Sequence, residues 1–313
     1  MHIHPYDNKN KPIVNINDSK VPLNYLNIIN LKKDQSFEYI IPGYESCIVP
    51  ATGTIDINIE GLEFKSIGKR IIDVWDGEPE GVYVPTNIKA EFVCKTETAE
   101  IFIAGAKFDK TLEPFAVREN EIDKVQYGSD DTKTHRKIKH ILGGQHHEKV
   151  GRLLCNELYT VGQGGWSGFP PHKHDTDRLP NETRHDETYN YRFKPNNGFG
   201  FQLFQAENET IGKAAHIIDK STVLVDSGYH PCVVAPGYEM AEVAANQILD
   251  IETAMAKDID MSKKLKLIGV DVASFGEPFM PSSRGLSIVY ENKTKNLYKR
   301  INVSLDGKKL LGG

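Results

Sequence analysis

The sequence predicts a mainly β protein made of two successive β-barrels and a short α+β extension. Short runs of branched and aromatic residues recur along the chain, and glycine and proline turns separate them. The second half repeats the rhythm of the first, because Val82-Tyr-Val-Pro85 occupies the place that Gly228-Tyr-His-Pro231 holds later. We therefore expect a first barrel without metal ligands, a metal-binding second barrel and an extension, at residues 1–125, 126–245 and 246–313.

The first half contains the clearest strand pattern. Ile55, Ile57 and Ile59 alternate with polar residues, which is typical of a strand with one buried face. Glu60-Gly61 follows as a hairpin turn would. Further strands are predicted at residues 36–41, 70–75 and 100–104, before a polar connector at residues 118–139.

The second half continues this pattern up to a change in composition after Pro236. Strands are predicted at residues 152–159, 187–193, 198–204 and 221–225, and also around the His-x-His motif at residues 172–174. Residues 238–249 are rich in helix formers with apolar positions three and four apart, which predicts a helix. Later strands are predicted at residues 265–272, 287–290 and 298–305.

Composition bounds the class of protein. The chain has 313 residues, 26% charged residues and a net charge of −5, which argues against sequence-independent nucleic-acid binding. It has no apolar run near the roughly 18 residues of a membrane-spanning helix and no signal-peptide pattern. Four widely spaced cysteines without a Cys-x-x-Cys pair favour free thiols. We expect a cytoplasmic protein that acts on a small molecule, binds no nucleic acid or membrane, and is compatible with a homo-oligomer.

Three histidines and one glutamate form the most informative chemical pattern. His172 and His174 have the spacing that places two side chains on one face of a strand, and Glu187 opens an alternating run. His230 lies in a turn-like segment before another strand. Imidazoles and a carboxylate suit a divalent ion such as zinc, manganese, iron or nickel. Four protein ligands would leave coordination positions for a substrate, so the pattern predicts a catalytic metal.

The remaining histidines fit this pattern less well, and a single histidine is more often a surface or hydrogen-bonded residue than a ligand. His146 and His147 are adjacent and would point to opposite faces of a strand. His2 and His4 lie near the chain terminus. His185 shares the strand parity of Glu187 and is a further candidate for the same pocket.

The metal-binding segments resemble a known family. Gly168-Phe-Pro-Pro-His-Lys-His-Asp175, Glu187-Thr-Tyr-Asn-Tyr-Arg192 and Gly198-Phe-Gly-Phe-Gln202 are similar to the 5-deoxy-glucuronate isomerases of inositol catabolism, which are bicupins. The resemblance runs from about residue 20 to about residue 237 and is shared, more distantly, with the uronate isomerases of pectin breakdown. It implies metal ligands at the same four positions that the spacing indicates.

The end of the chain resembles a different family. Residues 234–249 and 264–276 are similar to the end of the flavin domain in NAD(P)H-dependent nitrite reductase large subunits, with a junction at about residues 233–239. This tail has no Gly-x-Gly-x-x-Gly fingerprint and no iron–sulfur cysteine set, so we expect no flavin or NAD. The resemblance implies a continuation beyond residue 313. A helix at residues 238–249 would replace the last barrel strand and lower the thermal stability of the barrel.

The resemblance implies a ketol-isomerase that converts 5-deoxy-glucuronate to 5-dehydro-2-deoxy-gluconate with zinc or manganese. A divalent ion would polarise the carbonyl, and a base would move a proton between adjacent carbons. The sequence identifies no base. Tyr189 and Tyr191 share the face of Glu187 and are candidates to bind substrate, as are Gln202 and, on the opposite parity, Arg192. The alternatives are a pectin-pathway uronate isomerase, an iron dioxygenase and a non-catalytic sugar- or metal-binding cupin.

Overall fold

Strands dominate the structure. The computed structural model describes residues 1–177, 184–247, 263–267, 270–274, 285–292, 297–306, 308 and 310–312. Helical structure within these ranges is limited to three short 3-10 turns, at Val74–Asp76, Glu119–Glu121 and Gly144–His146. No helix in the same ranges has the length and apolar character needed to cross a membrane. The predicted mainly β class is confirmed.

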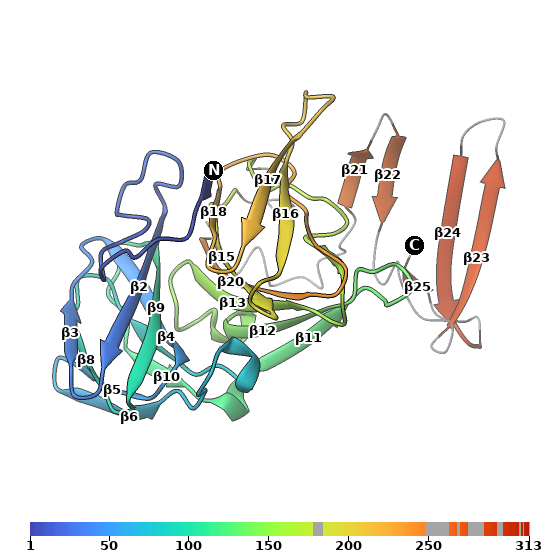
Figure 1. Cartoon of the computed structure of the whole chain (residues 1–313). Helices are drawn as coiled ribbons and strands as arrows, with labels where there is room; N and C mark the ends of the chain where they lie inside the picture. The colour runs from blue at the N-terminus through green and yellow to red at the C-terminus, as the bar shows by residue number, and fades with distance from the viewer. Residues whose placement is uncertain are drawn as a thin grey trace.

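The N-terminal half forms two sheets that share one core (Figure 1). Isoleucines from both sheets fill this core, among them Ile48 and Ile101 from the first sheet and Ile55 and Ile57 from the second. The first sheet has the order β10-β7-β4-β9-β2, with bounds Phe115–Val117, Gly81–Val84, Tyr44–Thr52, Thr98–Lys107 and Asn24–Lys32. The second has the order β3-β8-β5-β6, with bounds Ser36–Tyr39, Ala90–Cys94, Ile55–Ile59 and Leu62–Ile67.

The second half also forms two sheets with a shared core. Tyr191 and Met240 from one sheet pack with Ile217 and Val234 from the other. The larger sheet has the order β1-β18-β15-β20-β13-β12-β11, with bounds His2–Ile3, Thr222–Val225, Glu187–Lys194, Glu239–Gln247, Leu153–Thr160, Arg136–Leu142 and Asp123–Tyr127. The smaller has the order β14-β19-β16-β17, with bounds Gly165–Ser167, Cys232–Val234, Phe199–Phe204 and Lys213–Ile218.

A third core joins the two halves. Leu26 and Phe102 of the five-stranded sheet pack there with Cys155 and Val243 of the seven-stranded sheet. The seven-stranded sheet is therefore covered on both faces, by the five-stranded sheet on one side and by the four-stranded sheet on the other. We call the contact between the five- and seven-stranded sheets the seam. We call the space between the seven- and four-stranded sheets the inner side.

The predicted helix at residues 238–249 is wrong as far as the structure describes it. Residues up to 247 form β20, which pairs with β13 on one side and with β15 on the other. Met240 packs into the inner core, while Ala241 and Val243 pack into the seam. Apolar neighbours on both faces outweigh the helix propensity of this segment. The second half therefore has its central strand, and the expected loss of stability has no structural basis.

Two other predicted strands are also absent. At residues 70–75 the side chain of Arg70 is buried, whereas Ile71 and Ile72 are 86% and 80% exposed, so no two-residue alternation forms. The carboxylate of Asp73 instead accepts a hydrogen bond from the backbone of Val74 (2.7 Å) and begins a 3-10 turn. The segment around His172 and His174 has no regular secondary structure.

The described residues of the C-terminal region are mostly strands (Figure 1). The single strand predicted at residues 265–272 is a hairpin of two strands, β21 (Lys263–Leu267) and β22 (Val270–Ser274). A separate sheet contains β23 (Gly285–Asn292), β24 (Leu297–Ser304) and β25 (Leu310–Gly312). The predicted boundaries after residues 125 and 245 fall inside β11 and β20, and the division into three units stays a proposal.

A buried ion pair crosses the seam. Both terminal nitrogens of Arg70, from the first half, donate to the carboxylate of Glu157 on β13, at 2.7 and 2.6 Å. The two side chains are each 1% exposed. The hydroxyl of Tyr159 donates a further hydrogen bond to Glu157 (2.7 Å). Removing one partner would leave the other charge buried without compensation.

We therefore expect Arg70→Ala to lower the free energy of unfolding by about 3–5 kcal/mol, as measured by chemical denaturation. Lys65→Ala is the matched control, because Lys65 pairs with Glu63 at the surface, where the two side chains are 66% and 59% exposed. This control should change stability very little. An equal effect of the two substitutions would contradict a role for the buried pair in joining the halves.

Candidate metal centre

Four residues from three segments converge on the inner side of the seven-stranded sheet. His172 and His174 lie in the irregular segment between β14 and β15, and Glu187 is the first residue of β15. His230 lies in the turn that precedes β19. Glu187 has the parity of Tyr189 and Tyr191, which pack into the inner core. The fold therefore brings together residues that lie up to 58 positions apart in the sequence.

The ligand atoms of this cluster are close together. The Nε2 atom of His174 lies 2.9 Å from a carboxylate oxygen of Glu187, and the Nε2 atom of His230 lies 3.1 Å from the same oxygen. The two Nε2 atoms are 3.2 Å apart. One ring nitrogen of His172 lies within 4.8 Å of ring nitrogens of His174 and His230. His174, His230 and Glu187 thus meet at one point, and His172 lies beside the two histidines.

The tautomers of two histidines follow from their backbone partners. The Nδ1 atom of His174 lies 2.9 Å from the carbonyl oxygen of His185, and that of His230 lies 2.8 Å from the carbonyl oxygen of Gly228. Because a carbonyl oxygen can only accept, both Nδ1 atoms donate. In neutral rings both Nε2 lone pairs then point at the carboxylate of Glu187. Three atoms with lone pairs therefore lie in contact with one another. A metal cation bound between them would use all three as ligands.

Glu187 is ionised within this cluster. The residue is only 5% exposed. Burial alone would raise the pKa of Glu187, but the neighbouring imidazoles, that of His174 above all, hold this pKa well below its usual range. The hydroxyl of Tyr189 also donates a hydrogen bond to the carboxylate. A negative charge is therefore held at the point where the imidazoles meet.

His185 is a fifth member of the cluster. Its ring stacks on that of His174 with a centroid distance of 3.5 Å. Its Nε2 atom lies 3.6 Å from the second carboxylate oxygen of Glu187. With His174 and Glu187 it forms a second group of potential ligand atoms that lie within 4.8 Å of one another. The parity that made His185 a further candidate in the sequence thus corresponds to a real contact.

Asp175 connects the two segments that carry histidines, and sequence reasoning missed it. One carboxylate oxygen accepts from the ammonium of Lys173 (2.7 Å), and the other accepts from the backbone N–H of Gly228 (2.9 Å). Burial opposes ionisation, but these hydrogen bonds and one from Thr176 lower the pKa of Asp175 to about 2. The only sequence signal is an acidic residue directly after the His-x-His motif.

Three predicted substrate-binding residues lie beside the cluster and support it. The side-chain amide of Gln202 donates to the carbonyl oxygen of His230 (2.5 Å). The hydroxyl of Tyr191 donates to the side-chain oxygen of Gln202. Together with the hydrogen bond from Tyr189 to Glu187, these contacts hold the Glu187 side chain and the His230 backbone in place. A direct contact of these residues with substrate stays a prediction.

Arg192 lies on the opposite face of β15 and is away from the cluster. Its guanidinium donates to the carboxylate of Glu100 on β9 and lies 5.2 Å from the ring centroid of Phe102. The residue is 1% exposed at the seam. Strand parity predicts that Arg192 lies on the face of the strand opposite to Glu187, and its contacts at the seam agree with this prediction.

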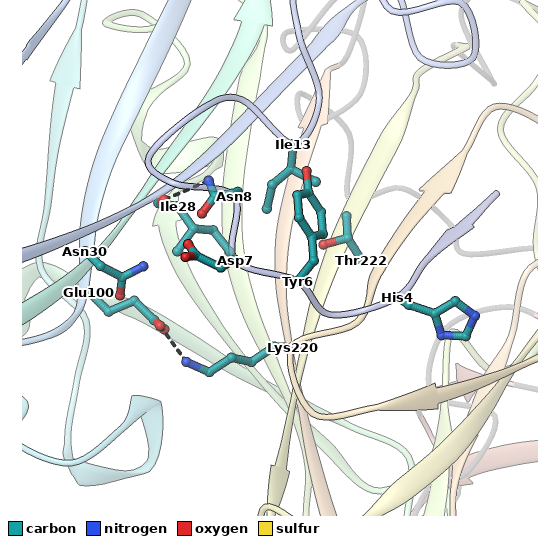
Figure 2. Close-up of a pocket in the computed structure, with 10 residues that line it drawn as sticks. All are labelled: His4, Tyr6, Asp7, Asn8, Ile13, Ile28, Asn30, Glu100, Lys220 and Thr222. Carbon is teal, nitrogen blue, oxygen red and sulfur yellow. Dashed lines mark hydrogen bonds and ion pairs between the residues drawn. The ribbon is translucent and has the colours of Figure 1, made fainter.

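Two cavities lie along the seam, and none of the four clustered residues lines either one. Figure 2 shows the smaller cavity, of about 280 Å³, beneath the N-terminal segment that carries Tyr6 and Asp7. The larger one, of about 820 Å³, lies beside Trp75 and Phe193. Glu100 and Lys220 line both cavities and form an ion pair of 2.6 Å, drawn as a dashed line in Figure 2.

The chain is similar to several known proteins. A family model described as the KduI/IolB family matches residues 2–241. A protein from Listeria monocytogenes serovar 1/2a that is named 5-deoxy-glucuronate isomerase is 29% identical to this chain, over 72% of this chain and 82% of that protein. The protein of the same name from Lacticaseibacillus casei is 30% identical over 72% and 83%.

Solved structures share the fold. An IolB-like protein from Salmonella typhimurium LT2 matches with a TM-score of 0.66 and 23% identity, over 79% of this chain and 88% of that one. Bacillus subtilis oxalate decarboxylase, described with Mn(II) centres, matches with a TM-score of 0.50 and 10% identity, over 72% and 68%. These likenesses confirm the cupin-type β fold.

The Glu100 pair makes stability depend on pH. Burial would raise the pKa of Glu100, but the charges of Arg192 and Lys220 outweigh it and hold this pKa below the ordinary value of 4.5. A depressed folded-state pKa stabilises the protein above the unfolded-state pKa and loses this effect as the pH falls through the folded-state value. We expect Glu100→Gln to be less stable than the unmodified protein at pH 6, with a smaller difference at pH 3, in urea unfolding. A difference that is constant with pH would contradict the ionised pair.

Proposed function

Because the chain belongs to the KduI/IolB family, we propose that it is a metal-dependent isomerase that converts the aldose form of a uronate to the ketose form. The substrate class comes from its relatives, which are named 5-deoxy-glucuronate isomerase. The observation that carries the proposal is the meeting of the Nε2 atoms of His174 and His230 with the carboxylate of Glu187. The reaction would convert 5-deoxy-glucuronate to 5-dehydro-2-deoxy-gluconate in inositol catabolism.

His172, His174, Glu187 and His230 would hold a divalent metal ion. Mixed imidazole and carboxylate donors favour a transition ion such as zinc or manganese over magnesium or calcium. The Mn(II) centres of oxalate decarboxylase, a protein with the same fold, support manganese as a candidate. Such an ion, when bound, polarises a substrate carbonyl and stabilises the negative charge that develops on its oxygen.

The residues of the chain prepare this site before substrate arrives. Hydrogen bonds from His174 and His230 to backbone carbonyls fix their Nε2 atoms as acceptors. Glu187 supplies a negative charge, and His230 is only 2% exposed, so bulk water is largely excluded from the inner end of the cluster. A dry, fixed arrangement of charges acts more strongly on a developing charge than the same groups would in water.

The direct test measures metal content and isomerisation together. We expect the purified protein to bind about one divalent ion per chain and to isomerise 5-deoxy-glucuronate in a coupled assay. His174→Ala should lose both properties, because it removes the imidazole that lies closest to the carboxylate of Glu187. His147→Ala is the matched control, because His147 is an exposed histidine outside the cluster. Full activity of metal-free protein would refute the proposal, and uronate binding without turnover would favour a non-catalytic cupin.

Asp175 should affect the metal through the position of His230. Asp175→Asn weakens the bond to the Gly228 backbone that holds the two histidine segments together, and it removes the charge that pairs with Lys173. We expect metal affinity to fall about 10- to 100-fold, measured by competition with a chelator, because loss of a supporting partner has effects of this size. Asp130→Asn is the control, because Asp130 is exposed and pairs only with His135 among the described ion pairs. Equal affinities of the two variants would show that Asp175 does not position the site.

A further inference from the structure

Arg136 is a cation on the inner side of the second half that the metal site does not use. It is the first residue of β12, opposite Thr160 of β13. Thr160 bonds in turn to the backbone of Met240, whose side chain lies in the inner core. Residues that are paired across a sheet share a face. Arg136 therefore faces the same side as Glu187 and Tyr189, in contrast to Arg192.

The guanidinium of Arg136 is hydrogen-bonded to the segment that carries the first two histidines. One terminal nitrogen donates to the backbone carbonyl of Phe169 (2.9 Å). Phe169 precedes His172 by three residues, so about 10 Å of extended chain at most separates these two positions. Tyr189, whose hydroxyl contacts Glu187, is among the groups that interact electrostatically with Arg136.

The charge of Arg136 has no direct ionic partner among the described residues. Within the part of the chain that the structure describes, the buried Nε atom of Arg136 has no hydrogen-bond partner, and no ion pair within 4.0 Å involves its guanidinium. Burial lowers the pKa of Arg136, and among its neighbours the carboxyl of Glu242 opposes this most strongly. The carboxyl of Glu242, however, accepts from the thiol of Cys232 (2.9 Å), and burial raises the pKa of Glu242.

We propose that Arg136 binds the carboxylate of a uronate whose carbonyl end is held at the metal centre. A guanidinium with free N–H groups matches a carboxylate in charge and geometry. A six-carbon chain spans about 7 Å from end to end, and the Phe169 carbonyl that Arg136 holds belongs to a residue at most about 10 Å of extended chain from His172. This inference rests on the proposed function and assigns to Arg136 the selection of an acidic sugar over a neutral one.

The inference can be tested with two pairs of ligands. The first pair is 5-deoxy-glucuronate and the same aldose with a hydroxymethyl group in place of the carboxylate. In Arg136→Met we expect KM for the uronate to rise about 10- to 100-fold, because a charge-assisted hydrogen bond is lost, and KM for the neutral sugar to stay unchanged. Arg136→Lys should recover part of the effect, since it keeps the charge.

Binding measurements separate this inference from the proposed function. Calorimetry with metal-loaded protein should show that D-glucuronate binds more tightly than D-glucose, and that Arg136→Met removes this preference without changing metal content. If the unmodified protein prefers glucuronate but does not isomerise 5-deoxy-glucuronate, the proposed function fails while the role of Arg136 stands.

The control and the contrary outcome are equally specific. Lys137→Met changes the next residue of β12, which lies on the opposite face and approaches Glu78 (3.9 Å), so the preference should persist. Arg136 could instead serve only to hold the Phe169 segment in place. In that case Arg136→Met would weaken both ligands of each pair equally, or neither, and the inference would be overturned.

Discussion

The seven-stranded sheet is buried on both faces, and the position of each chemical group depends on which face it occupies. Along β15, Glu187, Tyr189 and Tyr191 point to the inner side, whereas Arg192 points to the seam. The inner side carries the cluster of imidazoles and carboxylate. The seam carries the buried pairs of Arg70 with Glu157 and of Arg192 with Glu100, which join the two halves. Alternation along one strand thus separates a candidate reaction site from a structural interface.

The convergence of acceptor atoms on Glu187 needs support, because such atoms repel one another unless a cation lies between them. The structure provides this support through hydrogen bonds to atoms that are not ligands. Gln202 and the carbonyl of Gly228 hold the His230 turn, and Asp175 ties this turn to the His174 segment. The ligand positions are therefore fixed by three segments that meet independently of any ion.

The sequence predicted more of this site than of the strands around it. The spacing of His172 and His174, with a later Glu187 and His230, indicated the cluster because few other functions require these residue types together. The strand at β20 was missed because its alanines and glutamates favour a helix, and only neighbours on both faces show that it is central. Asp175 and Arg136 were missed because a single acidic or basic residue carries no spacing signal. Their contacts depend on chain segments that only the fold brings together.

The central claim is that one metal ion lies between these side chains, and a crystal structure of the metal-loaded protein tests it most directly. Diffraction data at the absorption edge of the ion should place one anomalous peak about 2.0–2.2 Å from the Nε2 atoms of His174 and His230 and from the carboxylate of Glu187. A peak at a different site, or none at this cluster in protein that contains stoichiometric metal, would contradict the account.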